Sequence, residues 1–360
     1  MERVHNFNPG PAALPLEVLK QAQEEFLDFK GEGMSILESS HRAKSFDALI
    51  IDAKKDLKSI MGLSDEYDVL FLGGGASTQF AMIPYNFLKE GTTADYINTG
   101  TWATAAIKES KKLGKTNVIA SSEDREFRYI PKDFKIDPDA CYLHITSNNT
   151  IRGTQWQSFP DTGNVPLICD MSSDFLSKKL DFSKFSLIYA GAQKNIGPAG
   201  VTVIVIKKSM LEKQRSGDLL TMLNYKTHIE KESLHNTPPV FPIYIVALVL
   251  KWVIKQGGLP AIEKLNDKKA GLLYSCLDNS NGFYRPTADK DSRSKMNITF
   301  RLPSEELEEK IAGEAKKAKL IGLKGHRSVG GLRASFYNAV SLESAEKLVE
   351  FLENFRKANS

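Results

Sequence analysis

The sequence predicts an α/β fold, with a mostly parallel, seven-stranded sheet in a large domain and a smaller α+β domain at the C-terminal end. Short apolar runs recur between residues 69 and 206, with turn and helix patterns between them. Most of these runs are apolar throughout, as in strands that helices cover on both faces. At 360 residues the chain is also longer than one core usually organises, which favours a second domain.

The N-terminal region predicts an irregular start followed by two helices. Proline and glycine residues interrupt residues 1–15. Residues 16–29 and 46–61 carry apolar side chains at helical spacing, and residues 31–42 between them predict a loop.

Seven short apolar runs predict the strands of the sheet. They span residues 69–72, 94–98, 117–120, 141–146, 166–169, 187–190 and 201–206. A further helix is expected at residues 79–88, directly after a glycine-rich turn.

The pattern changes after residue 210. Residues 219–237 are polar and predict a loop, whereas residues 243–256 predict a strongly apolar helix that ends at two glycines. The rest predicts helices at 259–278, 304–319 and 341–356, with Ser341 as an N-terminal cap, and strands at 296–301 and 332–337. We therefore expect a large domain of residues 16–258 and a small domain of residues 1–15 and 259–360.

Composition and charge exclude several classes of protein. The 48 basic and 44 acidic residues are too evenly balanced to argue for nucleic-acid binding. No apolar stretch reaches 18 residues, and the N-terminus lacks an apolar signal core, so neither a membrane span nor an export signal is expected. Cys141, Cys169 and Cys276 are few and widely spaced, which favours buried free thiols over disulfides or a zinc site and therefore predicts a cytoplasmic location.

Lys194 lies in a short connector between two predicted core strands. Small residues surround it, and Gly197 and Pro198 break the chain just beyond it. A lysine held in such a place loses solvation, which disfavours its charged form and keeps the amine nucleophilic toward a carbonyl group. The alternative is an ordinary surface lysine in a loop.

A glycine-rich turn at residues 73–78 follows the first strand of the sheet and precedes a helix. Backbone amides in such a turn can hold a phosphate group. The turn carries neither the G-x-G-x-x-G pattern of dinucleotide sites nor the G-K-[ST] of P-loops. The alternative is a tight turn without a ligand.

Three more polar or aromatic residues follow predicted strands. Asp170 lies 24 residues before Lys194, which leaves room for one helix and one strand, so both are expected at the same edge of the sheet. Trp102 could stack on a flat ring and Thr150 could meet a phenolic oxygen. As alternatives, Asp170 could cap a helix, Trp102 could fill the core and Thr150 could belong to a turn. Together with the glycine turn, these residues supply the parts that pyridoxal 5′-phosphate (PLP) requires.

Along its whole length the chain resembles the class-V aminotransferases of the fold-type-I PLP enzymes, in particular the branch that forms phosphoserine. The motifs that carry the resemblance are F-N-P-G-P-A-A-L-P (7–15), S-H-R (40–42), G-G-G-A-S (73–77), N-T-G-T-W (98–102), S-N-N-T-I-R-G-T (147–154), D-M-S-S (170–173), G-A-Q-K-N-I-G-P-A-G (191–200), H-N-T-P-P (235–239) and G-H-R-S-V-G-G-L-R-A-S-F-Y-N-A (325–339).

The resemblance implies how the cofactor is held. Lys194 would bind its aldehyde and then carry the proton of the reaction, with Asp170 at the ring nitrogen, Trp102 on the ring face and Thr150 at the phenolic oxygen. The residues implied for the cofactor phosphate are Ala76, Ser77, Gln193 and, from a second subunit, Asn236 and Thr237. An obligate homodimer with shared active sites would follow. Some members of the family carry, in place of Ser77, an arginine that helps to hold the substrate phosphate.

The resemblance also implies a substrate with two anionic ends. Arg333 would grip the α-carboxylate, for which a planar guanidinium is suited. The residues implied for a substrate phosphate are His41, Arg42, His326 and Arg327. The alternative for each is a surface cation, and the remaining histidines are expected to be structural.

The implied activity is transamination between 3-phosphohydroxypyruvate and L-glutamate, which gives O-phospho-L-serine and 2-oxoglutarate in serine biosynthesis. The 4-phosphooxy-L-threonine pair of pyridoxine biosynthesis would suit the same pocket. Cysteine desulfuration, another class-V reaction, needs a cysteine in a mobile loop, and the three cysteines here lie in predicted core or helix segments. A non-enzymatic phosphate-binding module with an inert Lys194 is the remaining alternative.

Overall fold

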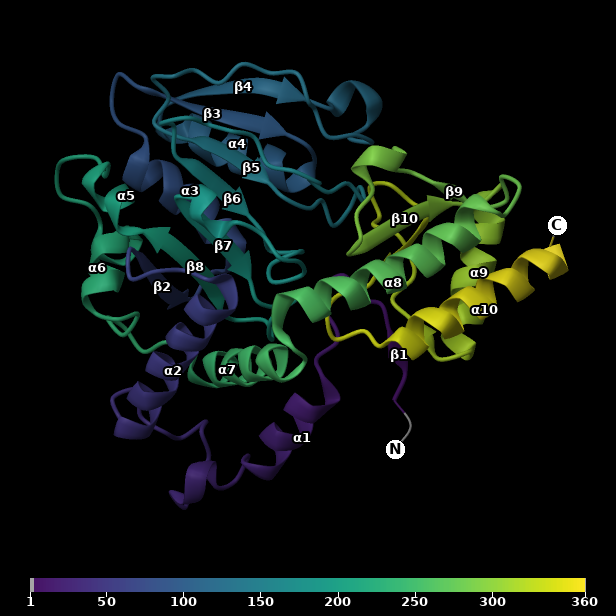
Figure 1. Ribbon diagram of the computed structural model, residues 1–360, viewed down its shortest axis with the longest axis horizontal. Coiled ribbons are helices and arrows are strands. Elements are labelled where there is room, and N and C mark those ends of the chain that lie inside the picture. The colour runs from purple at the N-terminus through teal and green to yellow at the C-terminus, as the bar shows by residue number, and fades with distance from the viewer. Residues whose placement is uncertain (1–2, 360) are drawn as a thin grey trace.

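The computed structural model describes residues 3–359, and its largest element is a seven-stranded sheet (Figure 1). The strand order is β2-β8-β7-β6-β5-β3-β4. Strands β3 to β7 run parallel, whereas β8 is antiparallel to both of its neighbours. The strands are β2 (Tyr67–Leu72), β3 (Thr93–Asn98), β4 (Lys115–Ser121), β5 (Leu143–Thr146), β6 (Leu167–Asp170), β7 (Leu187–Gly191) and β8 (Thr202–Lys207). All seven predicted strands are present, and the predicted fold class is confirmed.

Helices cover both faces of this sheet, which explains why its strands are apolar throughout. In β2, Val69 and Phe71 pack into the core that contains helices α2 (Lys44–Met61) and α7 (Val240–Lys255). The alternate residues of the strand point the other way, toward the helix pair α3 (Gly75–Phe87) and α4 (Thr101–Leu113). A strand between two helical layers therefore has no solvent-exposed face.

The second lobe has its own core. Its three-stranded antiparallel sheet has the order β12-β10-β9, and a separate pair joins β1 to β11 in parallel. The strands are β1 (His5–Asn6), β9 (Arg285–Pro286), β10 (Asn297–Arg301), β11 (Leu320–Ile321) and β12 (Leu332–Ser335), and the helices are α8 (Gly258–Asp278), α9 (Glu305–Lys317) and α10 (Leu342–Asn359). Phe7 packs into this second core, so the two ends of the chain share it.

Helix α8 belongs to both lobes. Leu259 and Ile262, near its start, pack into the core of the large sheet, whereas Leu273 and Leu277 pack into the second core. Figure 1 shows α8 running from the end of α7 to the far lobe. A division of the chain at residue 258 remains a proposal, because the helix that begins there ties the lobes together.

Some predicted segments differ from the structure. Helix α1 (Leu16–Glu24) is shorter than predicted, because the chain turns at residues 25–28. The predicted loop 219–237 contains the helix α6 (Tyr225–Glu230), and Trp102, which follows β3, lies in the first turn of α4. The remaining short elements are α5 (Lys208–Glu212), η1 (Phe29–Gly31), η2 (Glu123–Arg125), η3 (Phe182–Lys184), η4 (Thr221–Leu223) and η5 (Lys290–Ser292). Ser341 accepts a hydrogen bond from the Ser344 amide, as the predicted cap requires.

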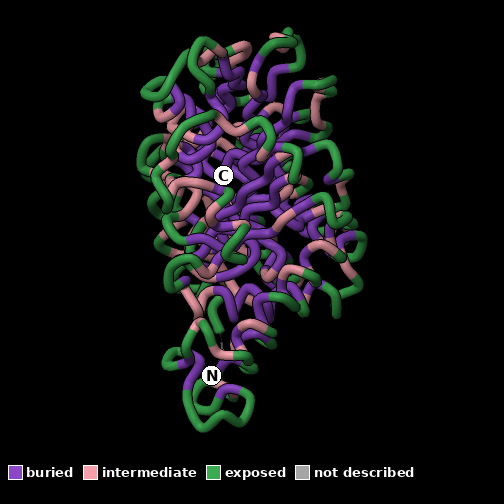
Figure 2. Tube along the Cα trace, turned by 90° about the vertical axis from the view of Figure 1, so that its left-hand side faces the viewer, coloured by how far each residue is buried: buried purple, intermediate pink, exposed green. Residues whose placement is uncertain are grey.

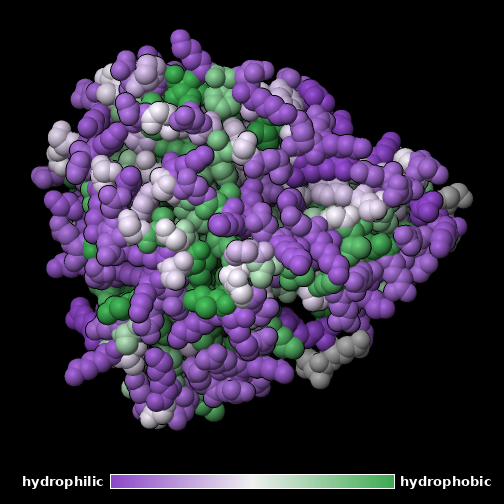
Figure 3. Space-filling view, in the orientation of Figure 1, coloured by the Kyte–Doolittle hydropathy of each residue, from purple (hydrophilic) through white to green (hydrophobic). Residues whose placement is uncertain are grey.

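The exposed and buried parts of the chain are clearly separated. Figure 2 shows buried chain through the middle of the molecule and a mostly exposed lower tip, which is the segment after α1. The face in Figure 3 is mostly hydrophilic, with hydrophobic side chains in separate groups.

Within residues 3–359, no single helix has the length and apolar composition to cross a bilayer, and α7 with α8 meets that test only as a pair bent by 85°. The three cysteines are free thiols, of which Cys169 is buried and the other two are half-buried.

A buried lysine fixes the segment between β12 and α10. Lys269 of α8 is fully buried, and its amine donates hydrogen bonds to the carbonyl oxygens of Phe336, Tyr337 and Val340 at 3.3, 2.9 and 2.9 Å. Burial lowers the pKa of Lys269 to about 7. The Lys269 amine thus ties the chain after β12 to the helix that spans both cores.

We predict that at pH 6, where the amine carries three N–H groups, Lys269→Met lowers the free energy of unfolding of the cofactor-free protein by about 1–3 kcal/mol, because three buried carbonyls lose their donor. The unfolded chain keeps the lysine proton up to the usual pKa of 10.5, whereas the folded chain releases it near 7. The native protein therefore gains stability from this group as the pH rises, so the deficit of the variant grows between pH 7 and 9. Urea unfolding at several pH values measures it.

Lys268→Met is the matched control, since Lys268 is the neighbouring exposed lysine of α8. Its free energy of unfolding should stay within about 0.5 kcal/mol of the native value. Equal effects of the two substitutions, or a deficit that does not change with pH, would contradict the role given to Lys269.

Candidate active site

Lys194 lies in the connector between β7 and β8, where the side chain is held on several sides. Its amine donates a hydrogen bond to the Thr150 hydroxyl at 2.8 Å and lies 5.5 Å from the centre of the Trp102 ring. Gly10 passes so closely that a Cβ atom there would be 3.3 Å from Lys194 Cγ. Burial lowers the pKa of Lys194 to about 8, and the nearby charge of Asp170 opposes that shift. The amine is thus much easier to deprotonate than that of a surface lysine.

Asp170 ends β6 at the same edge of the sheet. Strand register aligns it with Thr146 of β5 and Tyr189 of β7, so the connector that carries Lys194 begins next to it. One carboxylate oxygen accepts hydrogen bonds from the Ser172 amide at 2.9 Å and the Ser172 hydroxyl at 2.6 Å. Burial raises the pKa of Asp170, and the charge of Lys194 and the bonds from Ser172 oppose the rise. The structure therefore places Asp170 and Lys194 at the same edge of the sheet, as the sequence predicts.

The glycine turn forms the start of α3. Gly74 and Gly75 have φ angles of +89° and +68°, and a Cβ atom on Gly74 would lie 2.1 Å from the Thr78 hydroxyl. Only glycine suits this position. The helix therefore begins at Gly75, earlier than predicted, and the amides of Ala76 and Ser77 fall in its first turn. Amides of a first turn have no partner within the helix and can bind an anion.

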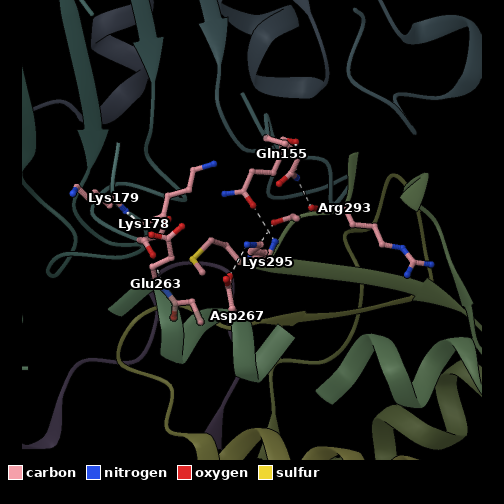
Figure 4. Close-up of polar contacts among 12 residues, drawn as sticks. Gln155, Lys178, Lys179, Glu263, Asp267, Arg293 and Lys295 are labelled. Carbon is pink, nitrogen blue, oxygen red and sulfur yellow. Dashed lines mark hydrogen bonds and ion pairs between the residues drawn. The ribbon is translucent and has the colours of Figure 1, made fainter. Parts of the chain in front are cut away.

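A second buried carboxylate, Asp174, lies behind Asp170. It accepts hydrogen bonds from the Ser147 hydroxyl and, at 3.0 Å, from the side-chain amide of Gln155. Gln155 in turn accepts the Lys295 backbone amide at 3.0 Å, and the Lys295 amine pairs with Asp267 of α8 at 2.5 Å (Figure 4). This chain of contacts connects the strand tips to the second lobe.

His144 and Tyr189 support Asp170 from within the sheet. From the sequence His144 is expected to be structural. In the structure it is fully buried in β5, and its Nε2 atom lies 2.9 Å from the Tyr189 hydroxyl. Burial lowers the pKa of His144 to about 3, so the ring is neutral. A hydrogen bond from Tyr189 helps to hold down the pKa of Asp170. The alternation of side chains along β5 and β7 indicates which residues share a face of the sheet. It does not reveal that His144 and Tyr189 touch, because β5 and β7 are not neighbouring strands.

Arg333 of β12 also reaches this site. Its side chain is buried, and one terminal nitrogen donates to the Thr150 carbonyl oxygen at 3.0 Å. Its Nε atom is buried and has no hydrogen-bond partner among the described residues. Thr150 therefore contacts both the amine of Lys194 and the guanidinium of Arg333, and it sets the spacing of the two groups.

His326 and Arg327 lie in the loop between β11 and β12. The His326 Nδ1 atom lies 2.7 Å from the Ser328 hydroxyl. Burial lowers the pKa of His326, and the positive charges of Arg333 and Arg327 lower it further. This loop therefore places the imidazole of His326 and the cationic Arg327 near Arg333.

Four predicted site residues are not brought to Lys194 within one chain. His41 and Arg42 follow the exposed lower segment and precede α2, and no hydrogen bond or ion pair in the described structure joins them to Lys194 or Arg333. Asn236 and Thr237 are exposed on the segment before α7. Gln193, by contrast, is adjacent to Lys194, and its carbonyl accepts the Ala12 amide at 2.9 Å. Residues 7–15 stand out in the sequence only as a motif, but in the structure they cover the lysine.

These residues fit PLP. The Trp102 ring is near the Lys194 amine, and its buried Nε1 atom has no partner among residues 3–359. Asp170 supplies a buried negative charge for a ring nitrogen, and the first turn of α3 supplies amides for a phosphate. When bound, PLP supplies an aldehyde that takes up amino groups and a ring that withdraws electrons from the substrate Cα.

We predict that the rate at which cofactor-free enzyme captures PLP covalently rises with pH around a midpoint near 8, because only the neutral amine of Lys194 attacks an aldehyde. Borohydride trapping of the enzyme with PLP measures the rate. The Lys194→Ala control should trap no PLP at this position. A midpoint near 10.5, the usual pKa of lysine, would show that the amine is not desolvated.

Comparisons with known proteins agree with this geometry. The family model for aminotransferase class-V matches residues 4–348. The phosphoserine aminotransferase of Desulfosudis oleivorans is 60% identical and covers 99% of each chain. The solved phosphoserine aminotransferase of Bacillus circulans subsp. alkalophilus has a TM-score of 0.98 at 54% identity over 100% of both chains. The PLP-bound phosphoserine aminotransferase of Trichomonas vaginalis has a TM-score of 0.92 at 36% identity, and covers 98% of this chain and 100% of its own. The chain therefore belongs to the class-V aminotransferases and, within them, to the PLP-dependent phosphoserine aminotransferases.

Proposed function

We propose that the enzyme transfers the amino group of L-glutamate to 3-phosphohydroxypyruvate, giving O-phospho-L-serine and 2-oxoglutarate in serine biosynthesis. The observation that carries the proposal is two neighbouring groups of basic side chains, one of which contacts Thr150 beside Lys194. Buried Arg333 is one, and the loop with His326 and Arg327 is the other. A substrate with a carboxylate at one end and a phosphate at the other fits both groups, and relatives named phosphoserine aminotransferase support the assignment.

Each residue has a separate task in this proposal. Arg333 binds the α-carboxylate, and its unpartnered Nε atom leaves donor capacity for that purpose. The Lys194 amine removes the proton from the substrate Cα and returns a proton later in the reaction. Thr150 holds the amine by a hydrogen bond, and Asp170 stabilises positive charge at the ring nitrogen of the bound cofactor.

Both substrates use Arg333, but only one uses the phosphate loop. In the first half of the reaction, L-glutamate gives up its amino group and leaves as 2-oxoglutarate. In the second half, the phosphorylated keto acid takes up the amino group. 4-Phosphooxy-L-threonine carries the same two anionic ends, so we still expect the enzyme to accept it. A cytoplasmic location likewise remains an expectation from the sequence.

A homodimer with shared sites is part of the proposal. The exposed segment after α1 carries four apolar side chains, Phe26, Leu27, Met34 and Leu37, with 41%, 80%, 39% and 57% of their surface exposed. Such a group is typical of a surface that a partner covers. His41 and Arg42 follow this segment directly, so a dimer that buries it would carry them to the partner's site. Exposed Asn236 and Thr237 are available for the same exchange.

We predict that Arg333→Ala lowers the second-order rate constant about a hundredfold for L-glutamate and for O-phospho-L-serine alike, because both lose the partner of their α-carboxylate. His326→Asn with Arg327→Gln should reduce the rate for O-phospho-L-serine by a similar factor and leave the rate for L-glutamate within about threefold of the native value. Single-turnover spectra of each half of the reaction measure these rates separately.

The two variants also control for each other. Damage to the general structure would lower both rates in both variants. If the phosphate-loop variant lost activity equally toward L-glutamate and O-phospho-L-serine, the proposed substrate would be wrong, even though the chain would remain an aminotransferase.

We predict that Leu27→Glu converts the native dimer into monomers and releases PLP, because the exposed apolar segment would carry a charge into the interface. Sedimentation velocity and the bound PLP per chain measure these effects. Val118→Glu on the edge strand β4, with 41% of the valine surface exposed, is the control and should stay dimeric. A native protein that sediments as a monomer, or a dimer unaffected by Leu27→Glu, would contradict this arrangement.

A further inference from the structure

A cavity of about 620 Å³ lies between the two lobes, and four arginines line it. Arg128 and Arg152 come from the large lobe, and Arg285 and Arg301 come from β9 and β10. Figure 1 shows the chain after β4, which contains η2, lying beside the β9–β10 end of the second lobe. We call this cavity the arginine pocket.

Three of the four arginines have little compensating charge. Arg301 is paired with Glu308 at 2.6 Å and lies 3.7 Å from Glu305. Among the residues that line the pocket, Glu126 is the only carboxylate available to the other three arginines, and 82% of its side chain is exposed. It lies 4.0 Å from Arg152. The lining therefore carries an excess of about two positive charges once Arg301 and its partner are set aside.

The three arginines also keep unused donors. Arg128 donates through Nε to the Thr287 carbonyl at 2.8 Å, and Arg285 donates one terminal nitrogen to the Leu302 carbonyl. The Nε atom of Arg152 is buried and has no hydrogen-bond partner in the described structure. Because a guanidinium carries five N–H groups, most donors of the three arginines are left for a ligand.

We propose that the arginine pocket binds a phosphate or phosphomonoester dianion, at a site separate from that of the reacting substrate. Planar guanidinium groups match the oxygens of a phosphate and can bind them in pairs. The volume exceeds that of one phosphate group, so the pocket also has room for a small organic phosphate. This site goes beyond the proposed function, which assigns no role to the four pocket arginines, although the charge of Arg152 helps to lower the pKa of His326.

The pocket shares two segments with the candidate active site. Arg152 comes two residues after Thr150, which contacts Lys194 and Arg333. On the opposite side, Ser328 and Val329 line the pocket directly after Arg327, and Arg301 donates to the Val329 carbonyl at 3.2 Å. A dianion between these walls would tie the substrate loop to the large lobe.

Binding of inorganic phosphate to the PLP-loaded enzyme, measured by equilibrium dialysis in a phosphate-free buffer, tests the proposal. We expect two phosphates per chain, one at the substrate site and one in the arginine pocket. Arg128→Gln with Arg285→Gln should weaken one site at least about tenfold, and His326→Asn with Arg327→Gln should weaken the other. Arg125→Gln, a change to a nearby arginine that pairs with Asp289 outside the pocket, should keep both sites.

The outcomes separate this proposal from the proposed function. A single phosphate that is lost with Arg128 and Arg285, but kept without His326 and Arg327, would support the pocket and contradict the substrate site. Binding that is unchanged in the Arg128 and Arg285 variant would overturn the pocket.

A second variant works in the opposite direction. Glu126→Gln removes the carboxylate that competes with the ligand, so phosphate should bind the pocket about two- to fivefold more tightly. Misfolding cannot produce such a gain. Unchanged or weaker binding in this variant would also overturn the proposal.

Discussion

The proposed chemistry of this protein depends on a lysine amine held beside a buried carboxylate. Burial lowers the pKa of Lys194 to about 8, even though the charge of Asp170 acts in the opposite direction. At pH 7 a lysine with the usual pKa is neutral in fewer than about one molecule in a thousand, whereas one with a pKa near 8 is neutral in about one in ten. The sheet, the connector and the segment that covers them shield that amine from most of the solvent.

The topology explains how this is achieved. Parallel strands bring Thr146 and Asp170 to one edge, and the connector after β7 adds Lys194 at the same level. The second lobe then encloses the site with Arg333, while α8 packs into both cores and fixes the lobes to each other. A pocket that borders both lobes can therefore influence the loop that carries His326 and Arg327.

Much of this could be predicted from the sequence, since strands buried on both faces are apolar throughout and polar residues at their ends stand out. Asp170, Lys194 and the glycine turn were found in that way. The sequence could not reveal that Gly10 passes over Lys194, or that Asp174, Gln155 and Lys295 form a chain of contacts to α8, because these contacts join segments far apart along the chain. Helix α6 was missed because its six residues lie within a polar segment without a clear apolar period.

The most direct test is the Asp170→Asn variant, in which the pH dependence of covalent PLP capture by cofactor-free enzyme is compared with that of the native protein. Asp170 raises the pKa of Lys194, so without its charge the midpoint should move below about 8, toward lower pH. A midpoint that does not move, or that moves to higher pH, would show that the two groups are not coupled. Burial alone would then set the pKa of Lys194, and Asp170 would have no electrostatic part in the site.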